Sequence, residues 1–294
     1  MRVDLIGCGL LGTDICLYFI SKKIKIKIYC YNHQNLTQSK ERIDNRIQYL
    51  KETLQIRFPD NIFDYVSFSE ELENIEDAEL IIESISEDLH LKRELFQKIE
   101  KVTKGRAIIL TNTSSLNIYD LSKGLEHREN LIGANWWNPA FLMPLVELVK
   151  TNYVSEKTIE KVVLFLEEIE KKPIVLKRPI SGHVGNRLQF ALFREAIFLV
   201  NNNIASYEDI DNIVKYGLGL RLSVMGPFET AYCGGLETFK AISNNLFPEL
   251  SSEIHINEPM FSIMDNKLLY ENSKKDAIEK KRDKFLRKIN YQKG

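Results

Sequence analysis

The residues best suited to chemistry lie at the start of the chain, where Gly7-x-Gly9-x-x-Gly12 follows an apolar run and opens a helical pattern. In this context the first glycine permits a tight turn, the second lets the backbone approach a pyrophosphate, and the third allows close packing of helix on strand. The helix N-terminus favours an anion. A glycine-rich turn that binds nothing is the alternative. The context favours dinucleotide binding at Gly7, Gly9, Leu10, Leu11 and Gly12.

The second strand of a dinucleotide site usually ends in an acid that holds the ribose 2′-hydroxyl. Here the region reads Ile28-Tyr29-Cys30-Tyr31-Asn32-His33, with no acid and no Arg that would favour a 2′-phosphate. Asn32 or the backbone of Cys30 could bind the ribose, and His33 could contact a phosphate. The choice between NAD and NADP stays open, with NAD favoured because an NADP site usually carries a clear positive charge.

Alternating strand-like and helix-like segments must position these residues. Strand patterns occur at 3–6, 24–28, 80–82, 107–110, 131–135, 145–149 and 173–176, and helical patterns at 13–21, 36–57 and 89–102. This alternation predicts an α/β fold with a doubly wound parallel sheet. After Pro179 only helical patterns follow, at 184–201, 207–216 and 227–247. We therefore expect a Rossmann-type NAD(P)-binding domain over 1–178 and an all-α domain over 179–294.

The composition is that of an ordinary globular protein, because 44% of the 294 residues are hydrophobic and 28% are charged. A net charge of -1 weighs against nucleic-acid binding. The longest apolar run, 15–20, is too short for a transmembrane helix. Met1 leads straight into an apolar strand pattern, so we expect no signal or transit peptide, and the four cysteines form no C-x-x-C pair. We expect a cytoplasmic protein without a metal site or a membrane partner.

The charge is concentrated at one end. Residues 274–294 hold nine Lys or Arg and three Asp or Glu, against 31 and 38 in residues 1–273. One interpretation is a solvated helix. Ile278, Phe285 and Ile289 are at roughly helical spacing and could dock this helix against the rest of the protein. The other is a patch for the phosphates of a ligand. The first is favoured, since charge runs are usually solvated faces.

Several further blocks, in the same order, resemble the L-3-hydroxyacyl-CoA dehydrogenase family over about residues 3–239. They are Glu83-x-x-x-Glu87-x-x-x-x-Lys92, Thr111-Asn112-Thr113-Ser114-Ser115-Leu116, Asn138-Pro139, Pro144-Leu145-Val146-Glu147 and Gly182-His183-Val184-Gly185-Asn186-Arg187. Details such as Gly217-Leu218-Gly219-Leu220-Arg221 look closest to the branch that includes lambda-crystallin, gulonate and carnitine dehydrogenases and some short-chain hydroxyacyl-CoA enzymes.

The resemblance implies NAD or NADP as the cofactor, with Glu87, Lys92 and Asn112 near it and Asn138 on its nicotinamide side. It also implies a small-molecule substrate, such as an acyl-CoA or another acyl thioester, and a homodimer formed through the C-terminal domain.

The family oxidises a secondary alcohol with a His–Glu dyad, in which the His takes the hydroxyl proton and the Glu orients it. Such a base contributes roughly 10²–10⁴ in rate. By resemblance Glu147 is the dyad Glu, and Ser114 and Asn186 hydrogen-bond the substrate oxygen. The alternatives are a solvent-facing strand residue for Glu147, a helix N-cap for Ser114 and a domain cap for Asn186.

The departure that matters most lies twelve residues before Glu147, where the family has its catalytic His in H-F-x-N-P. This chain reads Asn135-Trp136-Trp137-Asn138-Pro139. An amide can hold a substrate oxygen but cannot act as a base near pH 7. Either another group takes the proton, with His183 or Glu147 as candidates, or the substrate needs less acid–base help, or turnover is lost. For His183 the alternative is a polar helix-start residue that faces solvent.

Two further departures bear on the substrate. Tyr232 stands where the family has an acid, and Glu41 stands where some hydroxyacyl-CoA enzymes have a Lys. The resemblance implies an NAD(P)-dependent oxidoreductase that interconverts a β-hydroxyacyl thioester, or a β-hydroxy acid, and its β-keto form, and the altered dyad indicates a specialised variant. The rivals are an NAD(P)H-binding homologue with little turnover and a reductase of another C=O or C=N substrate.

Overall fold

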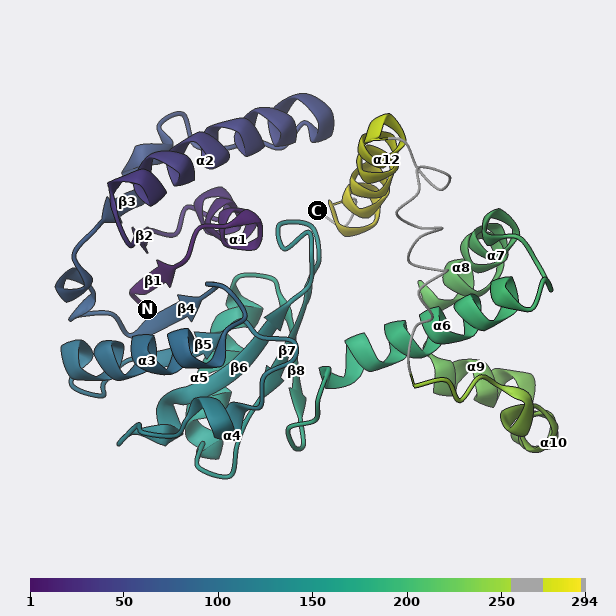
Figure 1. Ribbon diagram of the computed structural model, residues 1–294. Helices are drawn as coiled ribbons and strands as arrows, with labels where there is room; N and C mark the ends of the chain where they lie inside the picture. The colour runs from purple at the N-terminus through teal and green to yellow at the C-terminus, as the bar shows by residue number, and fades with distance from the viewer. Residues whose placement is uncertain (255–271, 292–294) are drawn as a thin grey trace. The chain divides into compact units, whose positions relative to one another are not determined.

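The computed structural model describes residues 1–254 and 272–291 of the chain (Figure 1). Its contacts divide the chain into two compact units. The first is Met1–Val184 together with Lys275–Gly294, and the second is Gly185–Lys274. The boundary predicted between residues 178 and 179 stays a prediction, and each unit is described by itself below.

The first unit is built on an eight-stranded sheet with the order β3-β2-β1-β4-β5-β6-β7-β8. The strands are β1 (Val3–Ile6), β2 (Ile26–Tyr29), β3 (Val66–Ser69), β4 (Leu80–Glu83), β5 (Ile108–Thr111), β6 (Leu131–Trp136), β7 (Leu145–Val149) and β8 (Lys172–Leu176). Neighbouring strands run parallel except β6 and β7, which pair antiparallel. The predicted α/β class with a doubly wound sheet is confirmed.

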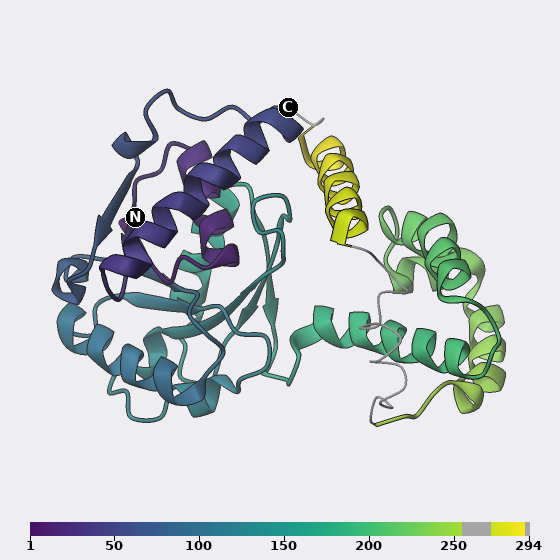
Figure 2. The same ribbon diagram turned by 45° about the horizontal axis from the view of Figure 1, so that its top comes forward.

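Five helices surround this sheet (Figures 1 and 2). They are α1 (Leu10–Ser21), α2 (His33–Leu54), α3 (Leu89–Thr103), α4 (Ile118–Leu121) and α5 (Glu156–Glu168). Short 3-10 turns lie at Ile62–Asp64, Leu72–Ile75 and Arg128–Asn130. Strands β1, β4 and β5 are buried along their whole length, because helices cover both faces of a parallel sheet. This explains why they read as continuous apolar runs.

Helix α2 shows how the sequence sets an element of the site. It begins after Asn32, whose side chain accepts a hydrogen bond from the backbone N–H of Asn35. Its buried residues include Ile43, Ile47 and Leu50, at the spacing of one helix face. The helix therefore buries one apolar stripe and leaves a second, polar stripe beside the glycine loop.

The C-terminal helix α12 (Asn272–Tyr291) belongs by its contacts to the first unit. It docks through a buried carboxylate, Asp283, which accepts the Tyr49 hydroxyl at 3.0 Å. The three residues predicted to dock the helix do not do so, since Ile278, Phe285 and Ile289 are 48%, 54% and 44% exposed. Their spacing was helical, but the stripe turned inward is the one that carries Asp283.

The second unit is helical, as predicted. Its helices are α6 (His183–Asn201, which starts in the first unit), α7 (Tyr207–Ile213), α8 (Gly219–Leu222), α9 (Pro227–Gly234) and α10 (Leu236–Leu246), with a π-turn at Val214–Leu218 and a 3-10 turn at Phe247–Glu249. Within the described part of the chain, α7 to α10 contain no buried residue. Large apolar side chains such as Phe228 are exposed. No helix in the described ranges is long and apolar enough to cross a membrane.

Candidate functional site

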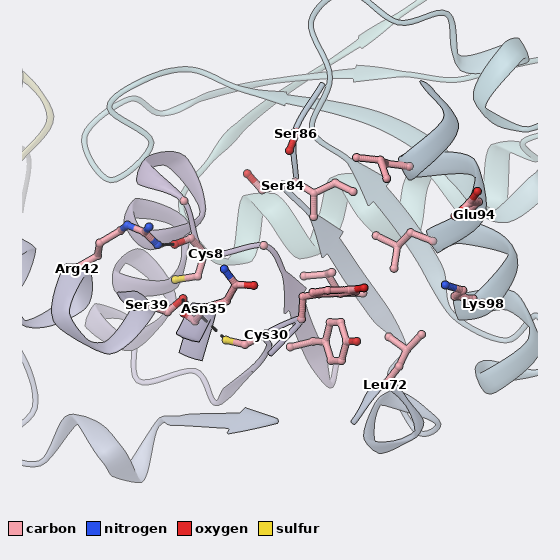
Figure 3. A pocket seen from close by; sticks show the side chains of 18 residues that line it. Cys8, Cys30, Asn35, Ser39, Arg42, Leu72, Ser84, Ser86, Glu94 and Lys98 are labelled. Atoms are coloured by element: carbon pink, nitrogen blue, oxygen red, sulfur yellow. Dashed lines mark hydrogen bonds between the residues drawn. The ribbon is translucent and has the colours of Figure 1, made fainter. Parts of the chain in front are cut away.

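A cavity of about 590 Å³ opens at the carboxyl ends of the strands, beside the glycine loop (Figure 3). Its walls include Gly7 and Gly9, Cys30 after β2, Ser84 after β4, and residues from α2 and α3. The sheet order places β1 between β2 and β4, so the cavity lies where the order of the strands reverses. Ligands of doubly wound sheets bind at this point.

The three glycines of the loop have different surroundings. Gly7 has φ +93°, and a Cβ there would lie 2.5 Å from the carbonyl oxygen of Ser84. A Cβ on Gly12 would lie 2.1 Å from the carbonyl oxygen of Gly7. By contrast, no atom in the described chain lies within 4 Å of a Cβ built on Gly9. Gly7 and Gly12 therefore permit the turn and the close packing, and Gly9 leaves open space above the backbone.

The N-terminus of α1 is suited to an anion. Its first turn contains no acid, and in the described structure no side chain caps it at Gly9. Leu10, the first helical residue, is 86% exposed, and Leu11 packs partly against the core. Free backbone N–H groups and the positive end of a helix dipole bind phosphate groups. The loop thus has the open backbone and the uncapped helix N-terminus that a dinucleotide pyrophosphate requires.

At the end of β2, where a partner of the ribose was predicted, the structure differs from the expectation in one respect. Cys30 is buried, with Sγ 3.8 Å from the Ser39 hydroxyl, and its backbone N–H is used by the sheet. Asn32 caps α2, and His33 pairs with Glu70 at 3.0 Å. An arginine is nevertheless present, because Arg42 of α2 lines the cavity.

Sequence reasoning missed Arg42 because it looked only at the strand end. Asn35, Ser39 and Arg42 all line the cavity and lie four and three residues apart, on one face of α2 (Figure 3). Arg42 donates from Nη1 to the carbonyl oxygen of Cys8 at 2.9 Å. Helical spacing after the second strand was the signal that could have found it.

Lys92, expected near the cofactor ribose, is fully buried in an ion pair. Its Nζ lies 2.7 and 2.8 Å from the two carboxylate oxygens of Glu83 and donates to the carbonyl oxygen of Asn112 at 3.2 Å. The Thr111 hydroxyl also donates to Glu83, at 2.6 Å. The ammonium is thus enclosed by protein and ties the ends of β4 and β5 together. Sequence reasoning had not assigned a role to Glu83.

Glu87 holds the loop that follows β5. Its Oε1 accepts hydrogen bonds from the Thr113 hydroxyl and from the backbone N–H groups of Ser114 and Ser115. Burial would raise the pKa of Glu87, but the hydrogen bonds from Thr113 and Ser115 outweigh it and lower the pKa. Ser114 is not a helix N-cap, because Asn117 caps α4.

Asn135 and Glu147 face each other on the antiparallel pair β6 and β7. The Asn135 amide donates from Nδ2 to Glu147 Oε2 at 2.9 Å. The Trp137 indole N–H donates to the same oxygen at 3.1 Å, and the Val184 backbone N–H donates to Oε1 at 3.0 Å. Glu147 is buried, so the solvent-facing alternative is wrong.

His183 is 2% exposed, which contradicts a solvent-facing position at the helix start. Its Nε2 lies 2.7 Å from the carbonyl oxygen of Thr113. A carbonyl only accepts, so Nε2 must carry the hydrogen, and in the neutral ring Nδ1 then holds a lone pair. Among the described residues no hydrogen-bond partner meets this buried Nδ1.

The remaining predicted residues have separate places. Asn112 accepts the backbone N–H of Trp136 at 3.2 Å, which ties β5 to β6. Asn138 is exposed just after β6. Asn186 and Tyr232 lie in the second unit, so their roles stay predictions.

Both parts of the chain match known families. Residues 2–179 match the NAD binding domain of 3-hydroxyacyl-CoA dehydrogenase, and residues 182–280 match its C-terminal domain. An L-carnitine dehydrogenase of Oceanobacillus iheyensis is 30% identical over 98% of this chain and 96% of its own length. The lambda-crystallin homolog of Mus musculus is 31% identical over 78% of this chain and 73% of its own.

A solved structure shares the fold. The crystal structure of an NAD+ dependent dismutase, 5-formyl-3-hydroxy-2-methylpyridine 4-carboxylic acid 5-dehydrogenase, has a TM-score of 0.87 and 22% identity, and the match covers 98% of this chain and 96% of that one.

Proposed function

The chain belongs to the 3-hydroxyacyl-CoA dehydrogenase family and is an NAD(P)-dependent oxidoreductase; we propose that it interconverts a β-hydroxyacyl thioester, or a β-hydroxy acid, with its β-keto form. We further propose that Asn135 stands in the place of the family's catalytic His. The family match over residues 2–179 and 182–280 supports the first proposal, and the 2.9 Å hydrogen bond from Asn135 to Glu147 supports the second.

The nicotinamide cofactor supplies the hydride acceptor or donor when it is bound. The chain's residues orient the substrate. Glu147 accepts hydrogen bonds from Asn135, Trp137 and Val184, and it thereby fixes the Asn135 amide. One N–H of that amide is used by Glu147, which leaves its second N–H and its oxygen to hold the substrate oxygen. Ser114, on the loop that Glu87 holds, is the second proposed partner of this oxygen.

His183 is the proposed acid/base. With Nε2 donating to Thr113, its Nδ1 can accept a proton and return it. Glu147 suits the role less well, because its two oxygens already accept three hydrogen bonds. In His183→Gln a side-chain N–H can still serve the Thr113 carbonyl, but no side-chain base remains. We expect turnover to fall roughly 10²–10⁴-fold, and the exposed His90→Gln is the matched control.

The experiment that tests the function is reduction of acetoacetyl-CoA and of free acetoacetate with NADH or NADPH, followed by the loss of cofactor absorbance. Turnover of either compound supports the proposal. Silence on both, in a protein that still binds the reduced cofactor, favours the second candidate function, an NAD(P)H-binding homologue. The observation that favours this candidate is the amide at position 135, where the dyad needs a base.

A second copy of the chain is the proposed partner. The helical unit exposes Phe228, Leu236 and other large apolar residues, and α7 to α10 bury none within the described chain. Exposed apolar surface of this kind marks an interaction site. Light scattering after size exclusion should give twice the mass of one chain, whereas a monomer at micromolar concentration would contradict the proposal.

A further inference from the structure

Lys171 is a fully buried lysine in the connection between α5 and β8. Its Nζ donates to the carbonyl oxygens of Ala140 and Met143, at 2.8 and 2.9 Å. The ammonium lies 3.5 Å from the ring centroid of Tyr18 and 5.3 Å from that of Trp136. In the described ranges no acid forms an ion pair with it. A buried charge without a paired ion is costly, so it is kept only where its contacts compensate.

The carbonyls that Lys171 binds belong to the turn 139–143, which joins β6 to β7. A third backbone group of the turn, the N–H of Phe141, points to the Asp14 carboxylate at 3.4 Å. Asp14 is itself buried on α1, the helix that follows the glycine loop. Since Ala140, Phe141 and Leu142 are buried, their backbone groups need partners inside the protein. Lys171 binds the carbonyl of Ala140 and Asp14 binds the N–H of Phe141, while the N–H of Leu142 donates within the turn to the carbonyl of Pro139.

The position of this turn matters because of what flanks it. Trp137 and Asn138 lie directly before it, and β7 with Glu147 follows it. Asn135 and Glu147 are paired across β6 and β7, so the turn closes the end of the ribbon that carries both. A shift of the turn would change the hydrogen bond from Trp137 to Glu147 and move Asn138.

Asp14 is itself held by an ion pair with a residue of α2. The Arg46 guanidinium of α2 donates to its two carboxylate oxygens at 2.7 and 3.2 Å. Arg46 also lies 3.8 Å from Asp283 of the C-terminal helix, and Tyr49 donates to that carboxylate. Alternating charges thus link α12, through α2 and α1, to the turn.

We propose that Lys171 and Asp14 are positioning residues of the dehydrogenase site, which hold the turn 139–143 by its backbone and so set the places of Trp137, Asn138 and Glu147. This inference rests on the proposed function for its kinetic consequence. Its structural consequence stands apart, because the two tryptophans of the chain, Trp136 and Trp137, are next to the turn and report on it.

The test compares Lys171→Met with Lys172→Met, which makes the same change at the exposed neighbouring residue. In Lys171→Met we expect a shifted tryptophan emission and a kcat for β-keto reduction at least about tenfold lower. The Kd for NADH should stay within about threefold, because the glycine loop and the cavity beside it lie outside the turn. Lys172→Met should resemble the wild type in all three quantities.

The pH dependence gives a readout that a merely structural role would not move. Burial lowers the pKa of Lys171 to about 7, while Asp14 opposes this and Lys22 adds to it. The tryptophan emission of the wild type and of Lys172→Met should therefore titrate near neutral pH. In Lys171→Met that transition should be absent.

A folded Lys171→Met whose emission and kcat equal those of Lys172→Met would overturn the proposal. If Lys171→Met does not fold, Asp14→Ala tests the same turn and should show the same kind of shift in tryptophan emission. An unchanged tryptophan emission in a folded Asp14→Ala would also overturn the proposal. If the wild type binds NADH but reduces no β-keto compound, the proposed function fails while the emission arm still decides whether Lys171 holds the turn.

Discussion

Replacing Asn135 by His tests whether the missing base limits the reaction. Residue 135 faces Glu147 across the strand pair, and the existing bond of 2.9 Å shows that a donor there reaches Oε2. In Asn135→His one ring nitrogen should donate to Glu147 and the other should face the substrate oxygen. The variant would then contain a His–Glu dyad within an unchanged set of Glu147 hydrogen bonds from Trp137 and Val184.

The expected gain follows from what a general base contributes. A positioned base is worth roughly 10²–10⁴ in rate, or about 3–5 kcal/mol of barrier. The imidazole is larger than the amide and residue 135 is buried, so overpacking should cost about 1–3 kcal/mol of folding stability. A side chain displaced by this overpacking would give only part of the gain in rate. We therefore expect acetoacetyl-CoA reduction to rise by roughly 10- to 1,000-fold.

The assay is kcat/KM for acetoacetyl-CoA across pH 5 to 9, with NADH binding measured in parallel. Asn135→Gln is the control, because it keeps the amide and also enlarges the side chain. Asn135→His should gain activity together with a new ionisation in its pH profile, and the control should gain neither. If a folded Asn135→His binds NADH normally but gains no activity, the pocket and not the base limits the reaction, and the reasoning is refuted.

Three further predictions concern the cofactor, a pH effect and the C-terminal helix. Cys30→Asp places a carboxylate at the ribose end and should raise the preference for NADH over NADPH by roughly tenfold in fluorescence titrations, about 1.4 kcal/mol; an unchanged ratio would contradict the placement of Cys30. The pKa of Lys171 is near 7 when folded and 10.5 when unfolded, so the unfolded chain binds more protons between these values and wild-type stability rises with pH. In urea melts the stability of Lys171→Met relative to wild type should accordingly fall by up to about 3 kcal/mol from pH 7 to 9, and a constant difference would refute the shift. Asp283→Ala removes the acceptor of the Tyr49 hydroxyl and should cost about 1–3 kcal/mol of unfolding free energy in the same melts, whereas the exposed Asp276→Ala on the same helix should cost little.

The sequence predicted the fold well because burial leaves a simple pattern in it. Strands β1, β4 and β5 are covered on both faces, so their residues are continuously apolar. Strand β3 was missed. It has four residues at the sheet edge, and only Val66 is buried, so the stretch Val66–Ser69 carries too little apolar pattern to stand out.

The site was predicted unevenly, for a physical reason. The glycine loop and Glu147 could be proposed as site residues because local spacing and ordered blocks mark them. Lys171 and Asp14 could not, because a charged residue in a sequence is usually at the surface. Their burial depends on carbonyl groups and carboxylates that distant segments bring to them, such as the turn 139–143 beside Lys171. Such partners are not visible in local spacing.

The arrangement around Glu147 separates the two roles of a His–Glu dyad. An amide N–H donates to a carboxylate as an imidazole N–H does, so with Asn135 in the place of a His, as we propose, the hydrogen bond to Glu147 is kept and the proton acceptor is lost. A histidine lies next in the chain to one of the donors of Glu147. Val184 donates to Glu147, and His183, the residue before it, contacts Thr113 at the end of β5. One peptide step therefore separates His183 from a residue that donates to Glu147, which places the proposed acid/base beside the hydrogen bonds of Glu147.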